Sequence, residues 1–373
     1  MKALLLGYYG ACNLGDDLML YCLLQWLMKQ KIQVTVVSEN PFDTKYRFKV
    51  KTVGNVPLLG EWGWPKIWFR KETIQLLNAI RQHDILIVGG GNLVRDDLGL
   101  RTFWYTMEKV VLAFLLHKPV YFINVGFKHP STKQGYQVLK WALKRCCKII
   151  VRDQLSVEVC NELGCKHLVK WVPDIVLRFP KLWENVIFDK QQAWLRSNSY
   201  CIVCLRGNPN VFGQYSIESK QVKNLAAILD YLIKKYELKI VFFPFQKGID
   251  ENNKSFHQQI FRFMKYKNNV VVKKWTENFL EVINYIQSAK LVIAMRLHAA
   301  VLAVALNRPC IAMPYDSKVY EFSKQAGIKY LLFPSDTYSF NKTLTCFEQA
   351  LNEVPDYTQI LKSVQIWERM SLW

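Results

Sequence analysis

The sequence lacks a long apolar run, a signal peptide and low-complexity tracts. The most apolar stretch, residues 291–306, contains Arg296 and His298 and cannot supply the roughly 18 uncharged residues of a membrane span. About seven apolar residues precede Cys12, which barely reaches the lower limit for a signal core, and cleavage there would remove the first predicted strand. We therefore expect a cytoplasmic protein with at most peripheral membrane contact.

Paired cysteine motifs are also scarce, although the chain has ten cysteines. Cys146 and Cys147 are adjacent, and most of the others lie within apolar runs, which favours buried reduced thiols over disulfides. Cys201 and Cys204 have the spacing of a metal knuckle, but no second pair accompanies them. We interpret this pair as core and expect no metal site.

The chain has 373 residues, which favours two domains, and its 51% hydrophobic and 21% charged residues are typical of a globular protein. Fifty lysines and arginines against 30 acidic residues give a formal charge of +20. The surplus is spread along the chain instead of forming a basic tail, and this fits an anionic substrate or an anionic membrane surface. No segment resembles a recognition helix or an aromatic RNA platform, so we expect no nucleic-acid partner.

Short apolar runs alternate with helical patterns along the whole chain, which is typical of βαβ units with parallel strands. In the first half, strands are predicted at 2–6, 33–37, 84–88, 120–124 and 148–151, with helices at 16–30, 102–116 and 135–145 between them. In the second half, strands are predicted at 200–205, 239–243, 270–272, 291–294 and 309–312.

The alternating pattern lapses around residues 179–199, where we place a domain boundary. We expect an N-terminal α/β lobe over residues 1–185, a C-terminal α/β lobe over 199–352, and a helix over 355–373 that can cross back to the first lobe. Two Rossmann-like lobes that face one another predict a cleft between them at the carboxyl ends of their strands, where ligands usually bind.

A glycine-spaced loop, residues 7–17, links the first predicted strand to a helix. Its spacing matches neither a dinucleotide fingerprint nor a P-loop, because the lysine is absent and Asp16 and Asp17 occupy the first helical turn. Two carboxylates there would repel a phosphate and suit a sugar hydroxyl, so we expect this loop, including Gly10 and Asn13, to contact substrate. The alternative is that Asp16 and Asp17 only cap the helix.

A second glycine-rich turn, Gly89, Gly90 and Gly91, follows the predicted strand at 84–88. Three glycines in this position leave room for a ligand or for the neighbouring loop at Gly7. We favour the ligand.

The most unusual helix start lies at Arg296 and His298, between the strand at 291–294 and an alanine-rich helix. Helix starts usually carry Ser, Thr, Asp or Asn, and departures from such rules mark functional positions. Arginine offers a fork of donors to a carboxylate or phosphate, and histidine exchanges protons near neutral pH. An ordinary core or surface histidine is the alternative.

Further charged residues follow two other strands of the second half. Arg206 comes after the strand at 200–205 and is either a second cation for the same anion or an ordinary exposed arginine. Asp316 and Lys318 follow the strand at 309–312 and supply a carboxylate and an ammonium group. No second histidine is apparent near Arg206 in the sequence, so the sequence gives no basis for assuming a two-histidine mechanism.

These motifs together resemble the polysaccharide pyruvyl transferase family. The loop at 7–17, the turn at 89–96, the Met-Arg-Leu-His-Ala run at 295–299 and the Tyr-Asp-Ser-Lys run at 315–318 agree with it in order and spacing over nearly the whole chain. Asn92 stands where a further glycine is common, and Arg95 stands where a polar neutral residue is more usual.

The resemblance implies a glycosyltransferase-B-like, two-lobed α/β fold and transfer of pyruvate from phosphoenolpyruvate to a sugar. The sugar would belong to a cell-surface polysaccharide or its lipid-linked precursor, and the products would be a pyruvate ketal and phosphate. Phosphoenolpyruvate is then a co-substrate and no further cofactor is expected. Two alternatives remain: a two-lobed glycosyltransferase that uses a nucleotide sugar, and a non-catalytic glycan-binding protein.

The resemblance implies that Arg296 and His298 of the second lobe meet the phosphoenolpyruvate, with Arg206 as a partner for its carboxylate or phosphate. As a mechanistic hypothesis, we expect His298 to be the proton donor. The first lobe would bind the acceptor, which Asp16 or Asp17 would position or deprotonate.

Overall fold

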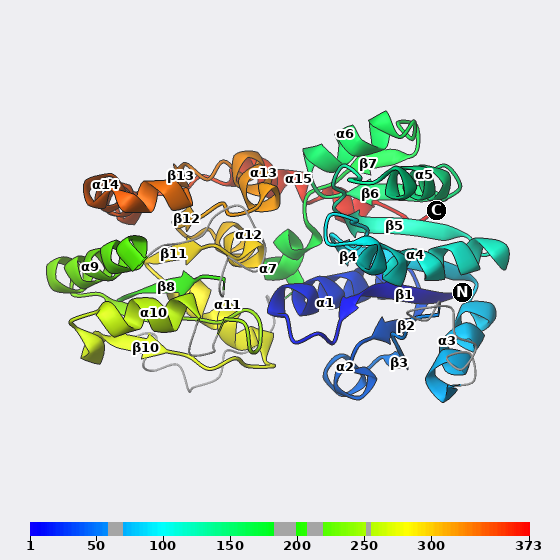
Figure 1. The fold of residues 1–373 in the computed structure, drawn as a ribbon, viewed down its shortest axis with the longest axis horizontal. Coiled ribbons are helices and arrows are strands. Elements are labelled where there is room, and N and C mark those ends of the chain that lie inside the picture. The colour runs from blue at the N-terminus through cyan, green and yellow to red at the C-terminus, as the bar shows by residue number, and fades with distance from the viewer. Residues whose placement is uncertain (59–69, 183–198, 207–218, 251–254) are drawn as a thin grey trace. The chain divides into compact units, whose positions relative to one another are not determined.

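The computed structural model describes residues 1–58, 70–182, 199–206, 219–250 and 255–373 (Figure 1). The chain divides into two compact units: unit 1 comprises Met1–Ile175 and Ser363–Trp373, and unit 2 comprises Val176–Lys362. Most of the predicted boundary segment, residues 183–198, lies outside the described residues. The domain limits 1–185, 199–352 and 355–373 therefore stay predictions.

The described residues of unit 1 form a seven-stranded parallel sheet in the order β3-β2-β1-β4-β5-β6-β7. Its strands are β1 (Lys2–Tyr9), β2 (Gln33–Ser38), β3 (Lys51–Gly54), β4 (Ile85–Gly91), β5 (Val120–Val125), β6 (Lys148–Val151) and β7 (Val169–Trp171). Its helices are α1 (Leu14–Lys29), α2 (Pro41–Phe48), α3 (Lys71–Gln82), α4 (Leu100–Leu115), α5 (Lys133–Leu143), α6 (Gln154–Glu162) and α16 (Ile366–Arg369).

The described residues of unit 2 form a six-stranded parallel sheet in the order β10-β9-β8-β11-β12-β13. Its strands are β8 (Tyr200–Cys204), β9 (Lys239–Phe242), β10 (Val270–Val272), β11 (Leu291–Ala294), β12 (Cys310–Ala312) and β13 (Tyr330–Leu331). Its helices are α7 (Phe179–Leu182), α9 (Ser219–Tyr236), α10 (Phe256–Phe263), α11 (Phe279–Ser288), α12 (Leu297–Ala305), α13 (Ser317–Ala326) and α14 (Phe340–Leu351), with α15 (Thr358–Ser363) at the boundary between the units. The predicted two-lobed, Rossmann-like α/β fold is confirmed.

In each sheet the strand order reverses once, between β1 and β4 in unit 1 and between β8 and β11 in unit 2. The central strands are buried on both faces, as their unbroken apolar sequences predict. At such a reversal the loops that leave the carboxyl ends of the two strands run in opposite directions, and ligands of open α/β sheets bind there. The fold therefore directs attention to the loops after β1, β4, β8 and β11.

Where the sequence predicts one helix over 355–373, the structure has two short helices, α15 and α16. The second packs into unit 1 through Trp367, which is fully buried. The indole nitrogen of Trp26 donates to the Trp367 carbonyl at 3.1 Å, and the Trp367 indole donates to the Pro173 carbonyl at 2.8 Å. The rings of Trp26 and Trp367 meet edge to face with centroids 5.3 Å apart. Chain segments more than 300 residues apart thus share one core.

Candidate functional site

The carboxyl edge of the unit 2 sheet gathers polar residues from four strands. Arg206 follows β8, Asp250 lies in the turn after β9, Arg296 follows β11, and Tyr315 follows β12. Because β8 and β11 are neighbours at the reversal of strand order, Arg206 and Arg296 leave the sheet beside one another. The pairing of these strands thus brings together two of the cations that the sequence motifs singled out.

The Arg296 side chain forms a two-pronged ion pair with Asp250. Its Nε and Nη2 donate to the two carboxylate oxygens at 2.9 and 2.7 Å, and Nη2 also donates to the Gln246 side-chain oxygen at 2.9 Å. Arg296 is only 7% exposed and Asp250 only 1%. These bonds engage Nε and Nη2 and hold the guanidinium in one orientation, with Nη1 as the nitrogen outside them.

Asp250 is itself fixed by the backbone. Its Oδ2 accepts hydrogen bonds from the N–H groups of Phe245 and Gln246 at 3.0 and 2.9 Å. Sequence analysis missed this residue because it lies in a polar turn with no strand directly before it. The only signal was indirect: a buried arginine requires a carboxylate partner.

His257, in the first turns of α10, is a second histidine beside Arg206, contrary to the sequence interpretation. Its Nε2 accepts a hydrogen bond from the Leu205 N–H at 3.0 Å, and the ring is almost fully buried. Burial lowers the pKa of His257 to about 4, with the Arg296 charge adding to the fall and Asp250 opposing it. Burial therefore favours the uncharged imidazole, which serves as an acceptor for the Leu205 N–H.

Arg206 reaches across the edge to Tyr315. Its Nη1 donates to the Tyr315 hydroxyl at 2.6 Å, and its backbone N–H points to the sulfur of Met295 at 3.3 Å. Burial raises the pKa of Tyr315, but the charges of Lys318, Arg206 and Arg296 outweigh it, so the net pKa is below the usual value. The phenol thus reports a positive potential created by three cations from three different strand ends.

His298 and Asp316 both lie at helix starts. Arg296 is the residue before α12 and makes no capping bond to it, so His298 lies in the first helical turn, half-buried. Asp316 does cap α13, since its carboxylate accepts from the Lys318 N–H at 3.2 Å. The predicted break of the capping rule at Arg296 and His298 is confirmed, whereas Asp316 obeys the rule.

In unit 1, the two carboxylates of the first glycine loop have different environments. Asn13, not an aspartate, caps α1 by accepting from the Gly15 N–H at 3.1 Å. Asp17 is fully buried and paired with Arg47 of α2, whose Nη1 and Nη2 donate to it at 2.9 and 3.0 Å. Asp16 is half-exposed, and its charge helps to raise the pKa of the neighbouring Tyr8, for which burial is the larger cause.

The glycines of unit 1 serve close packing. Gly10 has φ +74°, and a Cβ there would lie 2.3 Å from the Ser38 hydroxyl. Gly90 also has positive φ, and its Cβ would press on Met19 of α1 at 3.2 Å. The predicted turn at Gly89, Gly90 and Gly91 is wrong in one respect: all three belong to β4, and they leave room for helix α1.

Sequence analysis missed a polar cluster at the carboxyl edge of the unit 1 sheet. Arg152, directly after β6, donates to Asp174 at 3.1 Å and to the side-chain oxygen of Asn92 at 2.9 Å. Arg152 and Asp174 are 7% and 3% exposed. Nearby, Asn124 interrupts β5 with φ +58° at a register shift and accepts from the Ile175 N–H. A polar residue directly after a buried strand was the available signal.

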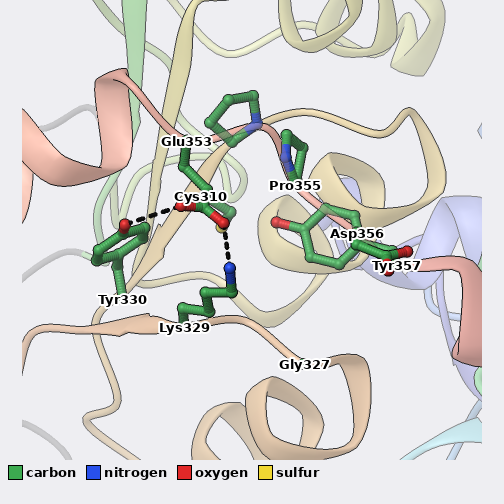
Figure 2. Close-up of a pocket in the computed structure, with 9 residues that line it drawn as sticks. Cys310, Gly327, Lys329, Tyr330, Glu353, Pro355, Asp356 and Tyr357 are labelled. Carbon is green, nitrogen blue, oxygen red and sulfur yellow. Dashed lines mark hydrogen bonds and ion pairs between the residues drawn. The ribbon is translucent and has the colours of Figure 1, made fainter.

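Figure 2 shows a small pocket at the opposite, amino-terminal edge of the unit 2 sheet, where Cys310 and Tyr330 begin β12 and β13. Its volume of about 10 Å³ holds no more than one water molecule. Glu353 closes it by accepting from Lys329 and from the Tyr330 hydroxyl. The pocket contains none of the residues that the motifs singled out, so the carboxyl edge remains the candidate site.

The ten cysteines, all within the described residues, form no disulfide, and Cys201 and Cys204 are buried in β8, as expected for core thiols. Within the described ranges, no three His, Cys, Asp or Glu side chains are grouped closely enough to hold a metal ion. No helix within those ranges has the length and apolar character needed to cross a bilayer.

Comparison with solved structures shows the fold. A UDP-GlcNAc 2-epimerase from Methanocaldococcus jannaschii matches with a TM-score of 0.69 and 14% identity, over 99% of both chains. One from Neisseria meningitidis bound to UDP-GlcNAc matches at 0.64 and 13%, again over 99% of both chains. The Escherichia coli ADP-heptose lps heptosyltransferase II matches at 0.53 and 13%, over 94% of this chain and 98% of that chain. Two-lobed, glycosyltransferase-B-like enzymes are thus similar in fold.

Comparison with curated proteins finds no match. The family model described as polysaccharide pyruvyl transferase, however, matches residues 13–317. That range begins at the cap of α1, includes Arg206, Asp250, Arg296 and His298, and ends at the start of α13. It spans most of the chain and includes residues of both units. The chain belongs to the polysaccharide pyruvyl transferase family.

Proposed function

We propose that this enzyme transfers pyruvate from phosphoenolpyruvate to two hydroxyls of a sugar and releases phosphate. The observation that carries the proposal is the position of Arg206, Arg296 and Lys318 after three strands at the carboxyl edge of the unit 2 sheet, where Arg206 donates to the Tyr315 hydroxyl. Phosphoenolpyruvate carries a carboxylate and a phosphate close together, and clustered cations are suited to such a ligand. Unit 2 is therefore the proposed donor-binding unit.

The proposed chemistry begins with proton transfer to the methylene carbon of phosphoenolpyruvate, which makes its C2 electrophilic. His298 is the proposed acid, because it lies in the first turn of α12, directly after Arg296 and Leu297. One sugar hydroxyl adds to C2 and a second displaces the phosphate to close the ketal. Of the two hydroxyl protons, one replaces the proton taken from His298 and the other leaves with phosphate. No cofactor beyond phosphoenolpyruvate enters this scheme.

Acceptor activation is assigned to Asp16 of unit 1. Asp17 is fully buried and held by Arg47, so we propose that it fixes the start of α1, while the half-exposed Asp16 positions or deprotonates a hydroxyl. Gly10 and Asn13 belong to the same loop and are proposed to contact the acceptor, and Asn13 also caps the helix that carries Asp16. The acceptor is a cell-surface glycan or its lipid-linked precursor. A lipid-linked acceptor would bring the enzyme to the cytoplasmic face of a membrane.

The test measures inorganic phosphate released from phosphoenolpyruvate by the purified protein in the presence of candidate glycan acceptors. The expected result is acceptor-dependent phosphate release and a product heavier by one pyruvate ketal in mass spectrometry. The same acceptors with nucleotide sugars serve as the control. Turnover with a nucleotide sugar and none with phosphoenolpyruvate would replace the proposal with a glycosyltransferase, which the structural neighbours make the main rival.

A further inference from the structure

Helix α2 of unit 1 exposes two large aromatic side chains. Phe42 is 83% exposed and Tyr46 is 69% exposed, and they lie four residues apart, so both project from the same face of the helix. Aromatic side chains of this size normally contribute to a core or an interface. Figure 1 shows α2 beside β2 and β3, where β3 is the edge strand of the sheet.

The helix is nevertheless well fixed on its inner face. Its cap, Asn40, accepts from the Asp43 N–H at 3.2 Å, and Thr44 is fully buried with its hydroxyl 2.7 Å from that of Ser38. Arg47 ties α2 to the first turn of α1 through Asp17. Phe42 and Tyr46 are therefore exposed on a helix whose opposite face is packed against the rest of unit 1.

Three exposed lysines lie in or next to the segment that carries the two rings. Lys45 and Lys49 belong to or adjoin α2, and Lys51 begins β3. The Lys49 ammonium lies 4.5 Å from the centroid of the Tyr46 ring. We name Phe42, Lys45, Tyr46, Lys49 and Lys51 the α2 surface.

The carboxylates near the α2 surface are already engaged. Asp43 accepts from Nε of Arg47 at 2.9 Å. Glu39 accepts from the Tyr105 hydroxyl at 3.1 Å and from the Asn55 amide at 2.9 Å. The α2 surface thus combines two exposed aromatic rings with three exposed lysines.

We propose that the α2 surface docks on an anionic lipid bilayer. Phe42 and Tyr46 enter the headgroup region, and the three lysines contact acidic lipid headgroups. Aromatic rings beside lysines favour a bilayer over a folded partner, because a bilayer accommodates flexible lysine stems and inserted rings without a shaped groove. The formal charge of +20 adds a general attraction to the same surface. The benefit of docking rests on the proposed lipid-linked acceptor. The ion pair between Arg47 and Asp17 joins α2 to α1, which is the helix that carries the proposed acceptor residue Asp16.

The experiment is co-sedimentation of the purified chain with vesicles of phosphatidylcholine, with and without phosphatidylglycerol, and without any substrate. We expect binding that requires phosphatidylglycerol and weakens with salt. The variant Lys45→Gln/Lys49→Gln/Lys51→Gln should bind roughly 100-fold more weakly. The variant Phe42→Ser/Tyr46→Ser should also lose at least about tenfold in binding.

Two matched control variants replace exposed apolar residues and exposed lysines that lie outside the α2 surface. Met28→Ser/Leu115→Ser alters two residues of unit 1 that are 62% and 69% exposed. Lys220→Gln/Lys234→Gln/Lys265→Gln removes three exposed lysines of unit 2. Both controls should bind vesicles like the unaltered chain. Equal binding to neutral vesicles, unchanged binding of the α2 variants, or equal losses in the controls would overturn the proposal.

Enzyme activity separates this proposal from the proposed reaction. Phosphate release with a water-soluble acceptor should be unchanged in both α2 variants, because none of the altered residues belongs to the proposed site. A chain that binds anionic vesicles through α2 but releases no phosphate from phosphoenolpyruvate would disprove the reaction and leave the docking surface standing. Phosphate release without vesicle binding would disprove the docking surface alone.

Discussion

Both carboxylate oxygens of Asp250 accept hydrogen bonds from Arg296. This arginine of the Met-Arg-Leu-His-Ala run is therefore oriented in the absence of a substrate. A pre-oriented guanidinium loses little conformational freedom when a ligand binds. The carboxylate of Asp250 is in turn held by two backbone N–H groups, so both members of the ion pair have fixed positions. Arg296, although only 7% exposed, is one of the three cations whose charges lower the pKa of Tyr315.

Replacing Asp250 with Asn should loosen Arg296. The change keeps the size of the side chain but leaves a buried cation without its counter-charge, which costs about 3–5 kcal/mol in the free energy of unfolding. The KM for phosphoenolpyruvate should rise more than kcat falls. Asp230→Asn is the control, because Asp230 is also buried but accepts only from the backbone N–H groups of Lys265 and Tyr266 in the described structure. Equal effects on KM in both variants would contradict a positioning role for Asp250.

The variant His298→Ala should lower kcat by about 10² to 10⁴ and leave the Kd for phosphoenolpyruvate nearly unchanged, because the imidazole supplies a proton and the cations supply affinity. Steady-state kinetics and calorimetric titration measure the two quantities separately. His167→Ala, which alters an exposed histidine of unit 1, is the control and should behave like the unaltered chain. Substantial activity in the His298 variant would remove His298 from the reaction.

Substitution of Asp17 should mainly lower stability, whereas substitution of Asp16 should mainly lower activity. Asp17→Asn leaves Arg47 without its buried partner and should cost about 3–5 kcal/mol in the free energy of unfolding. Asp16→Asn removes a half-exposed charge, which should change stability by less than about 0.5 kcal/mol and lower the rate of acceptor modification. Urea unfolding and the phosphate assay measure the two effects. The reverse outcome, an inactive but fully stable Asp17 variant, would move the acceptor role to Asp17.

His257 should make the protein sensitive to acid. Its pKa in the folded chain is about 4, against 6.5 when exposed, so the unfolded chain binds more protons between these values. The stability that depends on the neutral ring is present above pH 6.5 and is lost as the pH falls towards 4, by roughly 3 kcal/mol in total. His257→Gln keeps an acceptor for the Leu205 N–H and should flatten the fall in stability over this range. Denaturation midpoints at pH 7, 6, 5 and 4 test this.

Trp367→Ala should destabilise unit 1, since the indole is fully buried and bonded to Pro173. Loss of such a side chain costs about 3–5 kcal/mol. Trp373→Ala is the matched control, because Trp373 is 61% exposed and should cost far less. Thermal unfolding followed by tryptophan fluorescence compares the two. Equal losses would show that the C-terminal segment contributes to stability by some contact other than the buried indole.

The sequence predicted the strands well because each is a short apolar run buried on both faces. The strands at 148–151, 270–272 and 291–294 have the predicted limits. The sequence was a less reliable guide where contacts between distant parts of the chain determine the local structure. Gly89, Gly90 and Gly91 look like a turn in the sequence, yet they continue β4 because α1 needs the space that side chains would fill.

The sequence also located the charged residues of the candidate site, but not the partners that hold them. Arg206, Arg296 and Lys318 each follow a strand and can be recognised one at a time. Asp250 and Arg152 act through contacts with residues 46 and 60 positions away, at Arg296 and Asn92, and no local pattern encodes such distances. Burial distinguishes Asp17 from Asp16, and burial depends on the position of Arg47 in a different helix.

The packing of Trp367 against Trp26 has a consequence for synthesis of the protein. A ribosome makes the α1 segment early and the α16 segment near the end of this sequence, with all of unit 2 in between. Unit 1 cannot complete its core until residues 363–373 have been made, because the indole of Trp26 packs against Trp367. The sequence of unit 2 is complete before that point. A nascent chain arrested before residue 363 should therefore expose apolar surface in its first half, which would make it a target for chaperones.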